Sequence, residues 1–348
     1  MHEERSPGQE VLRDEGNCIA LKEEEIRKRS AFNRYLEVVA EDLQTMLVDR
    51  SAFVQVGCPA CGGSDCRRQF DKVGFTYVLC PHCGTLFVNP RPSAQVLIDF
   101  YTASPSASFW VHDFFEPVAE ARRERIFRPR AEYVGGTFPA MAKGTIGDTG
   151  AGFGLFLEEL AKLWPSARLV AIEPSPEMAD ICSEKGLEVI PCAVEDVQGW
   201  DSRFDLLTSF ELLEHLQSAG EFVNRIWHLL RPGGYLYLTT LNGEGFDIQV
   251  LWEQSKSVAP PHHLNFFNPR SLPMLLESNG FAIHSLDTPG QLDWDIVEGM
   301  YREEGVNPGR FWELIAERAE STIKESLQAW ISQNGFSSHM RVVARKKT

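Results

Sequence analysis

A glycine-rich turn between a strand-like and a helix-like segment constrains this chain more than any other feature. The turn reads GDTGAGFG from Gly147 to Gly154, after a strand-like run at 144–148 and at the start of a helix-like run at 153–164. Alternating glycines let the backbone turn tightly and approach a ligand closely, because no Cβ intrudes. The next strand-like run, 168–173, ends in Glu173, and a carboxylate there is suited to binding a ribose diol. The order of strand, turn, helix, strand and acid predicts nucleoside binding in a doubly wound α/β fold.

The spacing of the turn indicates which nucleoside. It reads Asp148-x-Gly150-x-Gly152-x-Gly154, whereas a dinucleotide fingerprint reads G-x-G-x-x-G. This pattern resembles the first motif of the class I S-adenosylmethionine (SAM) methyltransferases. Four further stretches agree with that family in the expected order: AIEPS with Glu173 and Pro174, CAVED with Glu195 and Asp196, FDLLTSFELLEHL from Phe204 to Leu216, and LLRPGGYLYLTT from Leu229 to Thr240. The resemblance covers about 145–345.

The resemblance implies a fold class: an α/β protein with a doubly wound, Rossmann-like, seven-stranded methyltransferase sheet. Strands are expected at 144–149, 168–173, 187–192, 204–210, 234–241, 281–286 and 340–345. The last strand is expected to lie antiparallel between the fifth and the sixth.

The same resemblance implies a set of SAM-binding residues. Ligands of open α/β sheets bind beyond the carboxyl ends of the strands. Gly150 and Gly152 are expected at the amino-acid end of SAM, Glu173 at the ribose, and either Glu195 or Asp196 at the adenine amine. The choice between Glu195 and Asp196 stays open, because either side chain could cap the backbone at Val197 instead. The remaining candidate cofactor-binding residues are Asp148, Gly154, Pro174 and Phe210.

Two C-x-x-C pairs mark the N-terminal region. CPAC carries Cys58 and Cys61, CPHC carries Cys80 and Cys83, and eighteen residues separate the pairs. This spacing lies in the range of zinc ribbons. Four thiolates close a tetrahedral shell and leave no position for water, so we expect a structural rather than a catalytic Zn²⁺.

A group of acidic and histidine residues follows the fourth expected strand. In FELLEHL, Glu211 and Glu214 are three residues apart, so on a helix both would face one side, with His215 adjacent. This element resembles the magnesium-binding segment of ubiquinone-pathway O-methyltransferases and small-RNA 2′-O-methyltransferases, and in the latter a later histidine completes the site. PPHHLNFF supplies His262 and His263 here. Two roles stay open: a Mg²⁺ site, or catalysis by His263 as general base with Glu214 and His215 shaping the loop.

Six regions are expected along the chain. They are a helical segment at 1–50, a zinc ribbon at 51–92, bridging helices at 93–135, a SAM-binding core at 136–288, a helical cap insert at 289–338 and a final core strand at 339–348. The first region contains one long helix-like pattern from Leu21 to Leu47, and the cap insert reads as helix over 311–330. His339, at the start of the final strand, is expected to make a structural hydrogen bond rather than to face the acceptor.

The ribbon, the following NPRP segment and an aromatic helix are together similar to bacterial zinc-bearing methyltransferases associated with surface-polysaccharide and sugar modification. The resemblance implies a small-molecule acceptor, namely the hydroxyl of a sugar, nucleotide-sugar or glycan. Two alternatives are a zinc-containing ribosomal-RNA methyltransferase and a catalytically silent adaptor with a SAM-binding fold. Intact SAM motifs argue against the adaptor.

Charge and composition argue against several partners. The net charge is −15 at pH 7, so we expect no nucleic-acid partner, because phosphate binding requires a basic face. The N-terminus is charged and lacks the apolar core of a signal peptide, and no apolar run reaches the ~18 residues that span a bilayer. These features predict a cytoplasmic protein without membrane insertion, and they leave a homodimer open.

Overall fold

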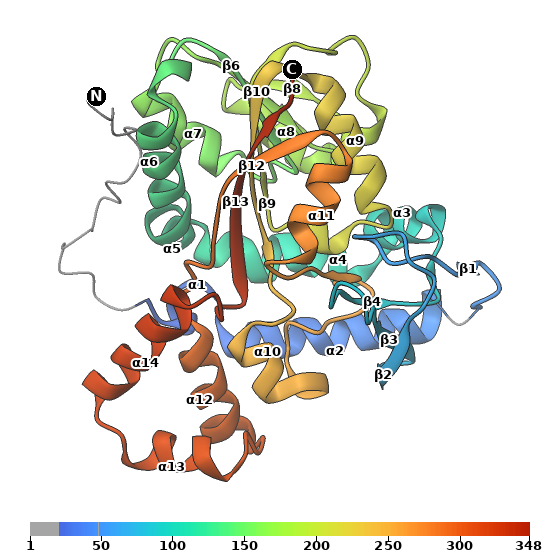
Figure 1. The fold of residues 1–348 in the computed structure, drawn as a ribbon, viewed down its shortest axis with the longest axis vertical. Helices are drawn as coiled ribbons and strands as arrows, with labels where there is room; N and C mark the ends of the chain where they lie inside the picture. Colours follow the sequence, from blue (N-terminus) through green and yellow to red (C-terminus); the bar gives the residue numbers. More distant parts are fainter. Residues whose placement is uncertain (1–20, 48) are drawn as a thin grey trace, which may run out of the picture.

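A seven-stranded sheet forms the centre of the computed structural model, which describes residues 21–47 and 49–348. Its strand order is β12-β13-β10-β9-β6-β7-β8 (Figure 1). The strands are β6 (Thr145–Thr149), β7 (Arg168–Ile172), β8 (Glu188–Ile190), β9 (Phe204–Phe210), β10 (Leu230–Leu241), β12 (Phe281–Asp287) and β13 (His339–Lys346). Only β13 runs antiparallel, between β10 and β12. The expected fold class and strand order are therefore confirmed.

Helices cover both faces of this sheet because alternate strand residues point to opposite sides. On one face, Leu207 and Leu238 pack with apolar residues of α9 (Ala219–Leu229) and α11 (Ser271–Ser278). On the other face, Leu206 and Tyr237 pack with α6 (Arg128–Thr137), α7 (Leu155–Leu163) and α8 (Pro176–Glu184). Because apolar side chains pack on both faces of the sheet, the carboxyl edge of the parallel strands is held in a fixed position. The candidate site lies at this edge.

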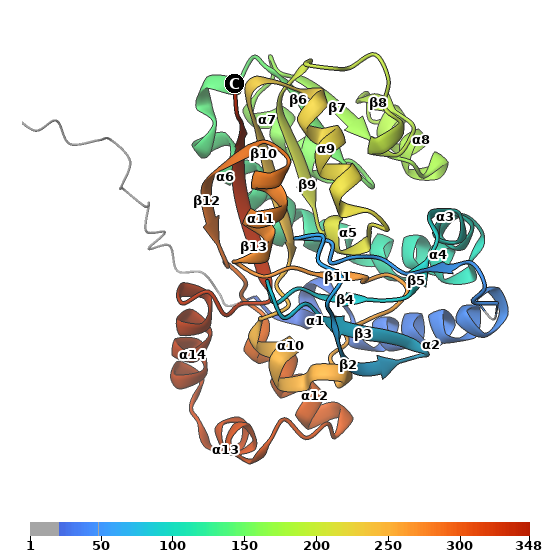
Figure 2. The same ribbon diagram turned by 45° about the vertical axis from the view of Figure 1, so that its right-hand side comes forward.

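The N-terminal β region is joined to the rest of the chain by a shared strand. Its sheet has the order β11-β4-β3-β2, with β2 (Arg67–Lys72), β3 (Phe75–Leu79), β4 (Leu86–Val88) and β11 (Asn265–Phe266). A second, two-stranded sheet pairs β1 (Phe53–Val54) with β5 (Arg91–Pro92). Because β11 comes from the segment after β10, the ribbon cannot move independently of that segment (Figure 2).

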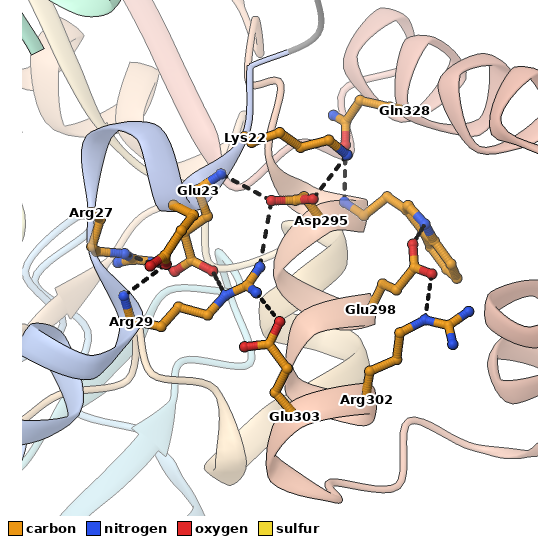
Figure 3. Close-up of polar contacts among 11 residues, drawn as sticks. Lys22, Glu23, Arg27, Arg29, Asp295, Glu298, Arg302, Glu303 and Gln328 are labelled. Atoms are coloured by element: carbon orange, nitrogen blue, oxygen red, sulfur yellow. Dashed lines mark hydrogen bonds and ion pairs between the residues drawn. The ribbon is translucent and has the colours of Figure 1, made fainter. Parts of the chain in front are cut away.

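The prediction of one continuous helix from Leu21 to Leu47 is wrong. The chain forms α1 (Glu23–Ile26) and α2 (Arg29–Met46), separated by extended backbone at Arg27 with φ −152°. The buried Glu23 carboxylate accepts hydrogen bonds from both Arg27 and Arg29, and its backbone N–H donates to Asp295 (Figure 3). Arg29 also pairs with Asp295 and Glu303, and these contacts with a distant segment favour a break that helix propensity alone does not predict. The expected segment 1–20 lies outside the described residues.

Helical elements make up the remaining connections. The bridge consists of α3 (Ala94–Ala103), α4 (Pro105–Phe109), a π-helical turn at Trp110–Phe115, a 3₁₀ turn at Glu116–Val118, α5 (Ala119–Arg122) and a second π-helical turn at Arg123–Phe127, which runs into α6. A segment after β10 forms α10 (Phe246–Leu251).

The insert before β13 contains α12 (Asp293–Glu304), α13 (Arg310–Arg318) and α14 (Ser321–Gln333) (Figure 1). The expected helical character over 311–330 is present in α13 and α14, which extended backbone at Ala319 and Glu320 separates. None of the helices in the described part of the chain is long and apolar enough to cross a membrane.

Candidate functional site

The glycine turn lies between β6 and α7. Gly150, Gly152 and Gly154 all have positive φ values, of 67°, 54° and 69°. A Cβ on Gly152 would come no nearer than 4.0 Å to Met178, whereas one on Gly154 would lie 2.7 Å from Leu187. Gly154 is therefore required for packing of the turn on its neighbours, and Gly152 leaves the open space that a bound nucleoside would need.

Glu173 lies directly against this turn. Its buried carboxylate accepts hydrogen bonds from the backbone N–H groups of Gly152 at 2.7 Å and Ser175 at 2.9 Å. Burial raises its pKa, and the two backbone donors oppose that shift. Asp148 is buried behind the turn, where it accepts from Thr208 at 2.7 Å, and burial raises its pKa to about 7. The turn and the acid at the end of β7 are thus brought together.

The other expected cofactor residues are placed less centrally. Glu195 and Asp196 form an exposed 3₁₀ turn, and Glu195 lines a surface hollow with Glu221 and Arg225 of α9. Pro174 is exposed, next to the residue that caps α8. Phe210, at the end of β9, packs edge-on against Phe156 with 4.7 Å between ring centroids.

Glu211 and Glu214 do not share a helix face, so that prediction is wrong. Only Leu213–His215 forms a 3₁₀ turn, and Glu211 has a φ of 50°. The Glu211 carboxylate accepts from Thr239 at 2.6 Å and pairs with Arg130 at 3.1 Å and with His339 Nδ1 at 3.1 Å. The expected structural hydrogen bond of His339 is present, and its partner is this acid.

The pKa values of Glu211 and His339 are both shifted far from their usual ranges. Burial alone would raise the pKa of Glu211, but His339 and Arg130 hold it well below its usual range. Although burial opposes its charged form, His339 has a pKa raised to about 9 by Glu211. The two residues therefore form a charged pair at neutral pH.

Glu214, His215 and His263 converge from two loops. One potential ligand atom of each lies within 4.8 Å of the others. The buried Glu214 carboxylate accepts from Thr240 at 2.7 Å, and burial together with Glu211 raises its pKa to about 8. The Nδ1 of His263 bonds to the Ser257 carbonyl, which makes it the donor and leaves Nε2 as the free lone pair. Burial lowers the pKa of His263 to about 4.

The ring nitrogens of His262 have partners outside this group. Its Nε2 lies 2.8 Å from the Tyr35 hydroxyl and its Nδ1 lies 3.3 Å from the Tyr101 hydroxyl. Tyr101 thus contacts a loop histidine, while Trp110 packs on Tyr35 and Phe114 in the core between the bridge and α2. Tyr35 and Tyr101 thus contact the loop that carries His262 and His263.

The four cysteines of the C-x-x-C pairs form one cluster. The sulfur atoms of Cys58, Cys61, Cys80 and Cys83 lie within 4.8 Å of one another, with Cys58–Cys83 at 3.4 Å and Cys61–Cys80 at 3.6 Å. A tetrahedral shell with Zn–S bonds of ~2.3 Å has sulfur–sulfur edges of ~3.8 Å. The donor set and spacing therefore fit a single zinc ion.

The ribbon contacts the loop that carries His263. The Tyr77 hydroxyl donates to the His263 carbonyl at 2.9 Å, and the Asn268 amide donates to the Cys83 carbonyl at 3.0 Å. Arg91, fully buried, donates to the Asn265 side chain at 2.9 Å, and Asn265 in turn donates to the Leu216 carbonyl at 2.7 Å. The cysteine cluster and the candidate catalytic loop are parts of one hydrogen-bonded unit.

Sequence reasoning missed several residues of this site. Thr239 and Thr240 each donate to one of the two acids, and although both end the stretch LLRPGGYLYLTT, that motif assigns them no role at the site. The pairing of His339 with Glu211 joins residues 128 positions apart, and no local pattern signals it. Only the position of Thr239 and Thr240 at the end of an expected strand could have indicated them.

Part of the chain is similar in sequence to known methyltransferases. Residues 118–286 match a family described as methyltransferase domain. A ubiquinone biosynthesis O-methyltransferase from Xanthomonas euvesicatoria is 31% identical over 176 residues, which are 47% of this chain and 72% of that protein. The chain belongs to the SAM-dependent methyltransferases.

A human relative of this methyltransferase matches over a shorter stretch. The human mitochondrial ubiquinone biosynthesis O-methyltransferase is 30% identical over 155 residues, 40% of this chain, and the chain spans only 42% of that protein's length. Among solved structures, a 1,6-didemethyltoxoflavin-N1-methyltransferase from Burkholderia thailandensis with bound S-adenosylhomocysteine is 15% identical. It has a TM-score of 0.48 and covers 81% of this methyltransferase and 100% of its own chain.

Proposed function

We propose that the protein transfers the methyl group of SAM to a hydroxyl oxygen of a small-molecule acceptor. The observation that carries this proposal is the state of His263. Its Nδ1 is occupied by the Ser257 carbonyl, which leaves Nε2 as the free lone pair, and its pKa is lowered to about 4, so it is neutral. One of its ring nitrogens lies within 4.8 Å of potential ligand atoms of Glu214 and His215. A neutral imidazole with one free lone pair is suited to accept the proton of a hydroxyl group.

The cofactor would be held by the turn and the acid at the ends of β6 and β7. Gly150 and Gly152 would contact the amino-acid end of SAM, and Glu173 would accept hydrogen bonds from the ribose hydroxyls. The contact between Glu173 and Gly152 N–H supports this assignment, because it fixes the acid at the edge of the turn. Glu195 or Asp196 stays the prediction for the adenine amine.

The proposed methyl transfer needs only SAM, the acceptor hydroxyl and His263 as the proton acceptor. Bound SAM supplies an electrophilic methyl group on a sulfonium. His263 would accept the acceptor's hydroxyl proton as the oxygen bonds to the methyl carbon, and the sulfur would keep the electrons of the broken carbon–sulfur bond in S-adenosylhomocysteine. The remaining contribution of the protein is to hold the acceptor oxygen in line with that bond.

For the acceptor, we propose a sugar-type hydroxyl, as in the zinc-bearing bacterial methyltransferases that the N-terminal region resembles. A phenolic hydroxyl is the second candidate, because the curated relatives are named as ubiquinone biosynthesis O-methyltransferases. Structural zinc would occupy the four-cysteine cluster in either case.

A divalent metal at Glu214, His215 and His263 is an alternative to the base. Two imidazoles and one carboxylate suit Mn²⁺, Fe²⁺ or Zn²⁺ better than Mg²⁺, which prefers oxygen ligands. His263 has one free lone pair, so the same atom cannot bind a metal and accept a proton. The two mechanisms are therefore mutually exclusive and separable by experiment.

The test is transfer of labelled methyl from SAM to panels of sugars, nucleotide-sugars and catechols, with product identification by mass spectrometry. We expect His263→Ala to lower turnover by about 10²- to 10⁴-fold with SAM affinity unchanged, whereas His284→Ala, an exposed change on β12, should have no effect.

Three outcomes would contradict the proposal. Activity that is lost with a chelator and restored by Mn²⁺ would favour the metal over the base. Methylation of ribosomal RNA instead of the panel would favour the RNA alternative. A protein that binds no SAM would favour the silent adaptor.

A further inference from the structure

Three arginines from separate segments face the same part of the site. Arg27 follows α1, Arg122 ends α5, and Arg130 lies in α6. Arg130 and Arg27 lie close enough to Arg122 for their charges to lower the pKa of its guanidinium. The Arg122 side chain donates to the Ile26 carbonyl at 3.4 Å, which brings it beside Arg27. Like charges held together in this way are unfavourable unless something compensates them.

Two of the three arginines already have acidic partners. Arg27 donates to Glu23 at 2.8 Å, and Arg130 pairs with Glu211 at 3.1 Å (Figure 3 shows the first). Arg122 differs, since within residues 21–47 and 49–348 no carboxylate lies within ion-pair distance of it, and its buried Nε has no hydrogen-bond partner. Burial, together with repulsion from Arg130 and Arg27, lowers its pKa to about 10, so it stays charged at neutral pH. The Glu211 carboxylate opposes that shift, but this acid already pairs with Arg130 and His339.

The position of Arg122 links it to the chemistry. Its guanidinium lies 4.7 Å from the centre of the Phe115 ring, and Phe115 stacks on Phe153 of the glycine turn at 4.7 Å with an interplanar angle of 11°. On the other side, Arg130 lies 4.7 Å from the ring of Phe210, immediately before Glu211. Arg122 therefore stands between the turn expected to hold SAM and the acid at the end of β9.

SAM itself would not compensate this charge. It carries one carboxylate but also an ammonium and a sulfonium, so its binding adds a net positive charge to the site. A buried cation without an anionic partner is costly. Because Glu211 is shared with Arg130 and His339, a further anion beside Arg122 would be favourable once the cofactor is bound.

We propose that Arg122 binds an anionic group, a carboxylate or a phosphate, carried by the methyl acceptor. This inference rests on the proposed function and narrows its substrate class: nucleotide-sugars, sugar acids and carboxylated phenols fit, and neutral sugars and simple catechols do not. Carboxylates and phosphates each present two oxygen atoms that can accept hydrogen bonds from two N–H groups of one guanidinium.

Matched probe pairs test the inference on the full-length protein saturated with S-adenosylhomocysteine. The pairs are 3,4-dihydroxybenzoate against catechol, and thymidine diphosphate glucose against methyl glucoside, with affinity measured by calorimetry. We expect one anionic probe to bind at least about tenfold more tightly than its neutral partner, as for a charge-assisted hydrogen bond. Arg122→Gln should abolish that preference, Arg122→Lys should retain part of it, and the SAM affinity of both variants should be unchanged.

Arg125→Gln is the matched control, because Arg125 is a partly exposed arginine on the same helical run, paired with Glu25 at 2.8 Å. Equal affinity for both members of each pair would overturn the inference. So would a loss of SAM affinity in Arg122→Gln with the anion preference kept, because the arginine would then serve the cofactor's carboxylate. Methyl transfer to a neutral acceptor, undiminished in Arg122→Gln, would overturn the inference and leave the proposed function standing.

Discussion

Glu211 shows how single residues at this site are held against their intrinsic preferences. A positive φ of 50° costs a residue with a Cβ about 1–3 kcal/mol. The conformation persists because Thr239, Arg130 and His339 all bind the carboxylate. These contacts turn the Glu211 side chain toward β13, so Glu214 is the carboxylate that lies with His215 and His263.

Asp247 yields a residue-scale prediction about pH. Both of its carboxylate oxygens are buried, and within the part of the chain that the structure describes neither has a hydrogen-bond partner. Burial and the nearby Asp293 raise its pKa to about 8. A raised pKa means that the folded state binds the proton more tightly than the unfolded state. Stability is therefore lost as the pH rises from about 4 through 8.

Asp247→Asn should remove this loss of folding stability at high pH. We expect the variant to be more stable than the natural protein by about 1–3 kcal/mol at pH 9, with a smaller difference at pH 6. Urea unfolding at the two pH values measures the free energies, and the exposed Asp180→Asn serves as control. Parallel pH slopes for the Asp247 variant and the natural protein would show that the buried carboxyl is not the cause.

At the scale of elements, the junction between α1 and α12 depends on charge. Glu23 lies between Arg27 and Arg29, and Arg29 also pairs with Glu303 and Asp295 of α12 (Figure 3). A helix of four residues has no stability of its own. The ion pairs therefore hold α1 in place, and with it the Ile26 carbonyl that contacts Arg122.

Glu23→Gln should release this segment, because it leaves the partly buried Arg27 without its carboxylate and takes one of three carboxylates from Arg29. We expect trypsin to cleave after Arg27, Lys28 and Arg29 about tenfold faster than in the natural protein. Mass spectrometry of a time course identifies the sites. Glu37→Gln, which alters an exposed pair on α2, should leave the rate unchanged, and an equal rate in both variants would contradict the role given to Glu23.

At the scale of the whole molecule, the ribbon and the methyltransferase sheet form one unit through β11 and the contacts of Tyr77 and Asn268. We expect one zinc per chain by elemental analysis. Its removal should lower the midpoint of thermal unfolding, because the binding free energy of structural zinc is also folding free energy. Methyl transfer should be lost before SAM affinity, because the ribbon supports the His263 loop and not the glycine turn.

Cys80→Ser should reproduce the effect of zinc removal, and Cys66→Ser, outside the cluster, should not. Calorimetric SAM titration and methyl-transfer assays on the same samples separate the two losses. Full methyl transfer by zinc-free protein would show that the ribbon does not position the loop.

The sequence alone determined the sheet, the glycine turn with Glu173, and the grouping of the four cysteines. Those features are readable because each depends on neighbours within a strand, a turn or a C-x-x-C pair, where local backbone rules apply. The tertiary structure alone decided the break between α1 and α2, the turning of Glu211 toward His339, and the joining of the ribbon to the His263 loop. It also placed Arg122 beside Arg27 and Arg130. Each of these depends on ion pairs and buried hydrogen bonds between residues far apart in the chain, whose energies appear only when folding excludes water from them.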